Sequence, residues 1–328
     1  MAVSIPEGLR RRYLGTREGR VWLSELPDRV AAALAGLELD LDLPEDGVPW
    51  HGSGALVVPA RDDARRVVLK FAFPHAEAAT EPAALELWNG NAAVRLLAQD
   101  PPGTFLVLER LDSGRTLQTE DMQTAVDEWG RLVRMLSLPV GEDPAWAAIP
   151  SIAERAEQLS DEMPAEWESL GRPFERWLLE AALEVSQVRG AVGRRTSNDV
   201  LVHTDLHFAN VLYRHGADGS GGFVAIDPQA MAGEAEFAVA PMLWNRMDSL
   251  DQRAPEADLR ERLHRLCVAG GLNEEAALGW SILREVRNAL RYVGDGAAGD
   301  AQRSLWVASA LVGRPHPGLP KVLELPAV

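Results

Sequence analysis

The stretch LVHTDLHFANVLYRHGADGSGGFVAIDP, residues 201–228, carries most of the chemistry visible in the sequence. Its apolar runs VLYR and FVAI flank a glycine-rich loop, a pattern that predicts a β-hairpin. Asp205 and Asn210 lie on the loop that enters the first strand, and Asp227 directly follows the second. Because a hairpin brings the start of one strand beside the end of the other, we expect these three side chains to lie at one end of it.

Transfer of a phosphoryl group from ATP requires side chains of this kind. One carboxylate orients the attacking hydroxyl and accepts its proton, while an amide oxygen and a second carboxylate hold Mg²⁺, which prefers hard oxygen ligands. We therefore predict that Asp205 is the catalytic base and that Asn210 and Asp227 are the metal ligands. The interval from Asp205 to Asn210 also resembles the catalytic loop of protein kinases, in which four residues separate an aspartate from an asparagine.

Two charged residues upstream fall in the order that a kinase-like fold requires. Lys70 lies in VVLKF, which predicts the strand whose lysine contacts the nucleotide phosphates, and Glu81 lies in the predicted helix that follows. Glu77 and Glu86 compete with Glu81 as partners of the lysine, because all three also suit a solvated helix face. The glycines of HGSGA, residues 51–55, are a further candidate for covering the phosphates, although they lack a G-x-G-x-x-G pattern.

Length and composition favour a two-lobed globular protein. A chain of 328 residues exceeds one ordinary compact core, and 46% hydrophobic with 25% charged residues is typical of folded proteins. The net charge of −16 repels a phosphate backbone, which argues against nucleic-acid binding, and it is compatible with a cationic small-molecule substrate. A solvated surface also explains much of this charge.

The sequence shows no feature of an exported or membrane-bound protein. The single cysteine, Cys267, cannot form an internal disulfide, and the first residues lack the apolar core of a secretion signal. No apolar run approaches the roughly 18 residues of a membrane span. We therefore expect a cytoplasmic monomer that does not bind membranes.

The pattern along the chain predicts an α+β fold of the bilobal, protein-kinase-like kind, with lobes at residues 1–111 and 112–328. In the first lobe, a helical arm with a break at Pro27 precedes a small antiparallel sheet and one main helix. The last two strands of that sheet flank a PPG turn at residues 101–103, and a polar stretch from Leu111 predicts the connection to the second lobe. That lobe is expected to be mostly helical apart from the hairpin, with helices at 121–138, 151–160, 173–190, 254–269 and 273–293.

Two other classes of function use the same residues. The segment HTDLH also reads as H-x-D-x-H, and alternation along a strand would direct His203, Asp205 and His207 to one side, as in a transition-metal site of a hydrolase. That interpretation leaves Lys70, Glu81 and Asn210 without a role. His203 also suits a purely supporting position in the loop. A nucleotide-binding pseudokinase without catalysis is the other alternative.

Taken together, these stretches resemble the aminoglycoside phosphotransferase family, in particular its streptomycin 6-phosphotransferase and hydroxyurea phosphotransferase branch. The similar segments run in order over nearly the whole chain: VVLKFAFPHAEAATEPAALELWNG with AVRLL, FLVLERLDSGRTL, LVHTDLHFANVL, FVAIDPQAMAGEAEFAVAPMLWNR, REVRNAL and SLWVASALVGRPHPG. The resemblance implies ATP, Mg²⁺ and transfer of the γ-phosphate to a hydroxyl of a small molecule. An aminoglycoside such as streptomycin is the first expectation, and hydroxyurea or a metabolic amino sugar is the alternative.

The resemblance also assigns roles residue by residue. It implies that Lys70 contacts the phosphates with Glu81 as its partner, that Asp205 is the catalytic aspartate, and that Asn210 and Asp227 hold magnesium. The segment VLERL is similar to the hinge behind the adenine, where backbone groups at two positions would bind the base. Those two positions are Glu109 and Leu111.

The sequence departs from the family pattern at two places. Thr204 stands in the catalytic loop where the family usually has glycine. Many members carry G-D-P-x-x-D after the metal-binding aspartate, whereas this chain has GEAEFA, with Glu234 and Ala238. Because the second aspartate of that pattern usually holds the catalytic loop in place, we expect that either another group does so here or the loop is looser.

The acceptor site is expected on the helical lobe. The predicted helix 273–293 carries a polar stripe of Glu285, Asn288 and Tyr292 beside its apolar stripe. A Glu285 that faced the cleft would bind a guanidinium or ammonium group, and an exposed Glu285 paired with a neighbouring arginine, Arg284 or Arg287, is the equal alternative. Weaker candidates for acceptor contacts are Glu234, Trp244 and Asp248.

Overall fold

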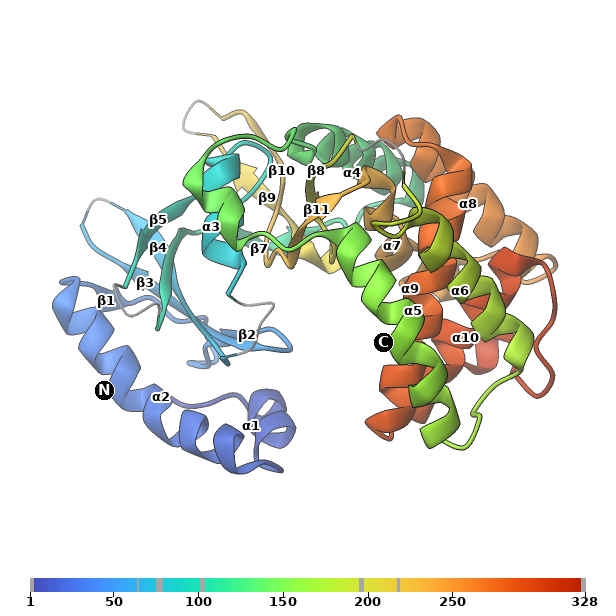
Figure 1. The fold of residues 1–328 in the computed structure, drawn as a ribbon. Helices are drawn as coiled ribbons and strands as arrows, with labels where there is room; N and C mark the ends of the chain where they lie inside the picture. The colour runs from blue at the N-terminus through green and yellow to red at the C-terminus, as the bar shows by residue number, and fades with distance from the viewer. Residues whose placement is uncertain are drawn as a thin grey trace. The chain divides into compact units, whose positions relative to one another are not determined.

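The computed structural model describes residues 3–63, 65–74, 79–100, 104–194, 198–216 and 219–325 (Figure 1). The chain divides into two compact units, residues 1–112 and residues 113–328. The PPG turn expected at residues 101–103 lies outside the described residues. Among the residues that the structure does describe, no helix combines the length and hydropathy needed to cross a lipid bilayer.

In its described residues, the first unit consists of an antiparallel sheet and three helices. The sheet has the order β1-β3-β4-β6-β5, and β2 pairs with β3. The bounds of its elements are α1 Glu7–Tyr13, α2 Arg17–Gly36, β1 Asp40–Leu41, β2 Trp50–His51, β3 Ala55–Arg61, β4 Arg66–Ala72, α3 Glu81–Trp88, β5 Leu96–Gln99 and β6 Leu106–Glu109. The central place of β4, between β3 and β6, explains why VVLKF is almost continuously apolar.

The N-terminal arm forms two helices, and the longer one builds the core of this unit. Helix α2 buries Trp22, Leu26 and Val30 in one cluster with residues of β3 and β4, and Figure 1 shows it running along the sheet. The expected break at Pro27 is wrong, because α2 continues through it. A proline removes one backbone hydrogen bond of a helix, but the buried residues on either side keep this one packed on the sheet.

The second unit contains the hairpin and most of the helices. Its strands are β7 Asp112–Thr116, β8 Val200–His203, β9 Val211–His215, β10 Gly221–Ala225 and β11 Ala230–Gly233. Its α-helices are α4 Met122–Leu136, α5 Ile152–Ser169, α6 Arg176–Arg189, α7 Ala240–Trp244, α8 Pro255–Gly270, α9 Glu274–Gly294 and α10 Ala298–Val312. Short 3₁₀ turns lie at Pro144–Ala148, Phe208–Asn210, Ala235–Ala238, Met247–Ser249 and Val322–Glu324.

The structure corrects three expectations for this unit. The polar stretch after Leu111 is strand β7 rather than a loose connection, and it completes the sheet β10-β9-β7. The helix expected at 151–160 extends to Ser169, through Pro164. Helix α10 was missed because nearly all of its residues are buried, which leaves no polar face and hence no amphipathic period to detect.

Candidate active site

The lysine and the glutamate expected at the nucleotide form a buried ion pair in the first unit. Lys70 lies on β4 opposite Val57 and Leu106, and Glu81 is the first residue of α3. The Lys70 Nζ atom lies 2.7 Å from Oε1 and 2.6 Å from Oε2 of Glu81. Lys70 is 6% exposed and Glu81 3%, so each charge depends on the other to compensate its lost hydration.

One of the two competing partners of Lys70, Glu86, is bonded elsewhere. Glu86 accepts a hydrogen bond from the side chain of Gln99, and Glu77 lies outside the described residues. The expected hinge follows at the end of β6. There the carboxylate of Glu109 accepts from the backbone N–H of Arg95 at 2.7 Å, and Leu111 is the last residue but one of the first unit. The Glu109 carboxylate is thus already hydrogen-bonded, which agrees with the prediction that backbone groups rather than this side chain would bind the adenine.

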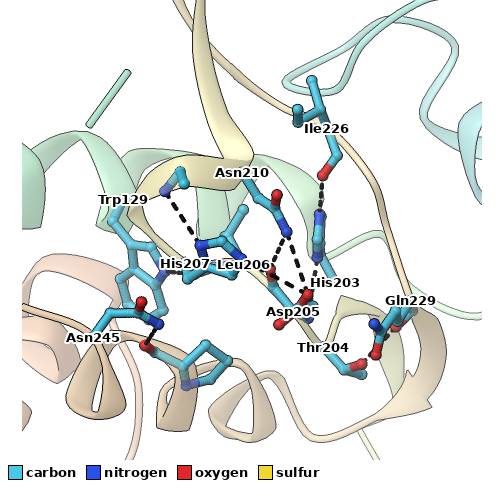
Figure 2. A network of polar contacts seen from close by, with 12 residues as sticks. Trp129, His203, Thr204, Asp205, Leu206, His207, Asn210, Ile226, Gln229 and Asn245 are labelled. Carbon is cyan, nitrogen blue, oxygen red and sulfur yellow. Dashed lines mark hydrogen bonds and ion pairs between the residues drawn. The ribbon is translucent and has the colours of Figure 1, made fainter. Parts of the chain in front are cut away.

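The hairpin of the second unit brings Asp205 and Asn210 together. Strands β9 and β10 pair in register up to Val211 and Ala225, and the N–H of Ile226 then donates to the carbonyl of Asn210 at 2.9 Å. The side-chain N–H₂ of Asn210 donates to the backbone oxygen of Asp205 at 2.9 Å and to its Oδ2 at 3.3 Å (Figure 2). Because the nitrogen of the amide points to Asp205, its oxygen is directed elsewhere and is suited to a cation.

Asp227 follows this pair of strands in an uncommon backbone conformation. Its φ of 55° lies in the left-handed region, which costs energy for a residue with a side chain. It is the first residue after Ile226, whose N–H is bonded to Asn210. The hairpin therefore carries its two oxygen-donor candidates, Asn210 and Asp227, on adjoining ends of paired strands.

His203 supports the catalytic loop through both of its ring nitrogens. The backbone N–H of Asp205 donates to Nδ1 at 3.2 Å, which requires that Nε2 carries the proton and donates to the carbonyl of Ile226 at 2.9 Å. His207 accepts from the N–H of Ala209 through Nδ1 and holds its Nε2 3.9 Å from Asp205. The histidines therefore contact backbone groups of the loop.

This geometry contradicts the transition-metal hypothesis. Strand β8 ends at His203, so the alternation assumed for HTDLH does not continue to His207. Within the described ranges, no three side chains of the His, Cys, Asp and Glu types are placed to hold a metal ion together. The H-x-D-x-H reading was wrong because the chain turns where the pattern assumed an extended strand.

The catalytic loop is hydrogen-bonded to groups outside it, on α4 and on the segment before β11. The indole N–H of Trp129, which is fully buried on α4, donates to the carbonyl of Leu206 at 3.0 Å. Thr204 donates to the carbonyl of Gln229 through its hydroxyl at 2.6 Å and through its N–H at 3.2 Å. Figure 2 shows these contacts around Asp205. Sequence reasoning missed Trp129, since no local pattern connects a helix residue to a loop 77 positions away.

The substrate candidates lie in different environments. Glu234 already accepts hydrogen bonds from Arg189 at 2.9 Å and from the indole of Trp280 at 2.6 Å. Trp244 donates to the hydroxyl of Ser304 at 3.0 Å and stacks on Tyr292. These bonds tie the segment after β11 to helices α6, α9 and α10.

Glu285 is buried on α9, so both expectations for it were wrong: its carboxylate is neither exposed nor open to a cleft. It is 1% exposed because this face of α9 packs against α10. Burial raises the pKa of Glu285 to about 7, and hydrogen bonds from Ser304 and Asn288 act in the opposite direction. The neighbouring Arg287 pairs instead with Glu166 at 2.5 Å.

The family model and the similar proteins point to the same family. The family model described as aminoglycoside/hydroxyurea antibiotic resistance kinase matches residues 41–296. The chain is 34% identical to a streptomycin 6-kinase of Streptomyces glaucescens, over 95% of this chain and 98% of that protein. It is 36% identical to a hydroxyurea phosphotransferase of Kitasatospora aureofaciens, over 95% of this chain and 87% of that protein.

Solved structures share the fold at low sequence identity. A thermostable mutant of aminoglycoside phosphotransferase APH(4)-Ia, in a ternary complex with AMP-PNP and hygromycin B, superposes with a TM-score of 0.52 at 15% identity, over 80% of this chain and 92% of that one. An ethanolamine kinase of Plasmodium vivax gives 0.57 at 14% identity, over 84% and 82%. These likenesses confirm the bilobal, kinase-like α+β fold predicted from the sequence.

Proposed function

Because the chain belongs to the aminoglycoside/hydroxyurea antibiotic resistance kinase family, we propose that it transfers the γ-phosphate of ATP to a hydroxyl of an aminoglycoside, with streptomycin as the first candidate. The observation that carries the proposal is the contact of Asn210 with Asp205 on the hairpin, the pair that phosphoryl transfer needs at one place. The similarity to streptomycin 6-kinases over nearly their whole length supports this acceptor.

In this proposal, Asp205 orients the acceptor hydroxyl and takes its proton as the phosphoryl group transfers. The Asn210 amide holds the Asp205 side chain through Oδ2, and the Trp129 and His203 contacts fix the backbone on which Asp205 lies. Positioning of this kind supplies much of the catalysis, because phosphoryl transfer asks little covalent chemistry of the protein.

The residues present suit Mg²⁺ as the accompanying ion. The Asn210 amide directs its nitrogen to Asp205, and its oxygen together with the carboxylate of Asp227 gives the hard donor set that Mg²⁺ prefers. When bound, Mg²⁺ would neutralise charge on the phosphates of ATP. In the first unit, Lys70 would contact these phosphates, with Glu81 holding its ammonium group in place. The backbone groups of Glu109 and Leu111 would bind the adenine.

For the acceptor, we keep Glu285, Asn288 and Glu234 as candidate residues, with different roles. Asn288 is half-buried and is the one suited to direct contact. Glu285 is buried behind it and hydrogen-bonds to it, so it would orient the Asn288 amide. The carboxylate of Glu234 already accepts two hydrogen bonds, so it would act mainly by holding the segment after β11.

A second acceptor has a specific observation in its favour. Hydroxyurea is phosphorylated by a relative that is 36% identical to this chain, as its name states. A metabolic amino sugar is the third possibility within the same reaction class. In each case we propose that the protein acts as a cytoplasmic monomer.

The test is an ATP-consumption assay with purified protein and Mg²⁺, using a panel of streptomycin, other aminoglycosides, hydroxyurea and amino sugars. We expect phosphorylation of streptomycin, identified by the added mass of the product, and dependence of the rate on Mg²⁺. Phosphorylation of hydroxyurea alone would show that hydroxyurea rather than an aminoglycoside is the acceptor, and the proposed phosphoryl transfer from ATP would still hold. Absence of turnover with every compound, together with tight nucleotide binding, would favour a pseudokinase.

A further inference from the structure

We propose that helix α1 positions the glycine-containing turn of residues 51–55 for the phosphates of the nucleotide, with Gly8 and Tyr13 as the positioning residues. The inference rests on the proposed function, because it assigns the phosphate-covering role to this turn. Neither helix α1 nor either of these two residues has a role in the reaction derived above. All the contacts concerned lie within the first unit.

The turn lies at the edge of the sheet where β3 begins and β4 ends, and Lys70 is near that end of β4. It connects β2 to β3, and the N–H of Gly52 closes it by donating to the carbonyl of Ala55 at 3.1 Å. In the register of the next pair, Ala55 lies opposite Ala72 and Val57 opposite Lys70. Two strand residues, about 7 Å, therefore separate the level of the turn from the level of the lysine.

Helix α1 contacts both sides of this turn. A Cβ atom on Gly8 would lie 2.8 Å from the imidazole of His51, so a side chain at position 8 would require this imidazole to shift. The same imidazole is hydrogen-bonded through Nδ1 to the carbonyl of Gly52 at 3.0 Å. At the other end of α1, the hydroxyl of Tyr13 donates to the carbonyl of Ser53 at 3.4 Å.

The Tyr13 ring links the turn to the sheet and to helix α2. Its centroid lies 4.5 Å from that of Phe73 and 5.0 Å from that of Trp22. Phe73 in turn donates its N–H to the carbonyl of Gly54 at 2.8 Å. Partial burial raises the pKa of Tyr13, so its hydroxyl keeps the proton with which it donates. Ser53 and Gly54 are thus each held by one member of this aromatic cluster.

These contacts fix the position of the turn and contribute less to the stability of the first unit than α2 does. Helix α1 contributes a single fully buried side chain, Leu9, to the core, whereas α2 contributes six buried residues. A glycine turn that covers phosphates works through its backbone N–H groups, so its conformation decides how well it binds. Holding that conformation before the nucleotide arrives lowers the ordering cost of binding.

The test compares Gly8→Ala, Tyr13→Ala and Tyr13→Phe with the wild type, and Arg11→Ala is the matched control. Arg11 lies on the same helix, is 75% exposed and pairs only weakly with Glu7 at 3.5 Å. Four quantities are measured: the Kd for AMP-PNP with Mg²⁺, which needs no acceptor, the KM for ATP, the KM for the acceptor, and kcat. Thermal unfolding of each variant accompanies them.

We expect Gly8→Ala and Tyr13→Ala to raise the Kd for AMP-PNP and the KM for ATP by about three- to tenfold, the range that loss of one or two hydrogen bonds produces. The acceptor KM and the kcat at saturating ATP stay near wild type. Tyr13→Phe keeps the ring packing but removes the donor to Ser53, so its affinity should lie between those of Tyr13→Ala and the wild type. Arg11→Ala should match the wild type.

Other outcomes overturn the inference. Unchanged nucleotide affinity in Tyr13→Ala and Gly8→Ala would show that α1 does not position the turn. An equal rise of the ATP and acceptor KM values, with lowered thermal stability, would assign these residues a structural role alone. If the wild type binds AMP-PNP and the variants bind it equally well, only the inference fails; if the wild type does not bind it, the proposed function fails as well.

Discussion

At the scale of single residues, Asp205 carries the clearest prediction. Replacing it with alanine should lower kcat by roughly a hundredfold to ten-thousandfold, the usual contribution of a positioned proton acceptor. The fold and the affinity for AMP-PNP should be retained, because the loop keeps its Trp129, Thr204 and His203 contacts. Steady-state rates and nucleotide titrations check this. Asp161→Ala, an exposed aspartate on α5, is the control, and substantial turnover by Asp205→Ala would exclude Asp205 as the base.

Glu285 gives a prediction about stability and pH. Its pKa in the folded protein is raised from 4.5 to about 7, so the folded state binds this proton more tightly than the unfolded state. The stabilisation from the neutral carboxyl is complete below the unfolded pKa and is lost as pH rises through about 7. Between pH 5 and pH 8, Glu285→Gln should therefore gain about 2–3 kcal/mol in unfolding free energy relative to wild type.

Denaturant unfolding at several pH values measures this difference. Glu275→Gln is the matched control, because Glu275 lies on the same helix in an exposed position and should show no such dependence. Parallel pH profiles for Glu285→Gln and wild type would mean that Glu285 is charged in the folded protein. A partner cation or a water would then have to compensate its burial.

At the scale of secondary-structure elements, α4 holds the catalytic loop through one indole. Trp129→Phe keeps the aromatic packing but leaves the buried carbonyl of Leu206 without its donor, which costs about 1–3 kcal/mol of stability. Because that carbonyl adjoins Asp205, we also expect kcat to fall by about tenfold with little change in the KM for ATP.

A matched control for Trp129 exists in the same unit. Trp167 on α5 is also buried and donates its indole N–H to a backbone carbonyl, that of Phe174, at 3.0 Å. Trp167→Phe should cost a similar amount of stability and leave kcat unchanged. Equal effects of the two substitutions on kcat would mean that Trp129 acts through general stability.

The link between β4 and α3 gives another test at this scale. Lys70→Met breaks the buried Lys70–Glu81 ion pair and should cost about 3–5 kcal/mol of unfolding free energy. The double variant Lys70→Met with Glu81→Leu replaces both charges by apolar groups, so it should recover much of that stability. It should still bind ATP poorly, because the proposed phosphate contact is gone. Recovery of both stability and affinity in the double variant would disprove a phosphate-binding role for Lys70.

At the scale of the whole molecule, the net charge of −16 bears on the acceptor. A strongly negative protein attracts a cationic substrate from a distance. At 0.1 M salt this attraction is largely screened at separations beyond about 10 Å. For streptomycin we expect kcat/KM to fall by about two- to tenfold between low and moderate salt, while the value for uncharged hydroxyurea stays nearly constant. Rates across a salt series measure this, and the same slope for both acceptors would show that net charge plays no part.

The sequence by itself determined the features that depend on local pattern. The order of Lys70, Glu81, Asp205, Asn210 and Asp227, the hairpin and the antiparallel sheet could all be predicted, because strand pairing over a short loop and helical periodicity are encoded by neighbouring residues. The Lys70–Glu81 pair could also be predicted from the sequence, because only 11 positions separate the two residues.

The tertiary structure alone decided which distant side chains meet. Trp129 reaches a loop 77 positions away, Arg189 and Trp280 converge on Glu234, and the polar stripe of α9 is partly buried against α10. Contacts of this kind depend on how whole helices pack, and packing is set by shape and volume summed over many residues rather than by any short pattern. For the same reason α10, in which ten of fifteen residues are buried, left no clear periodic signal in the sequence.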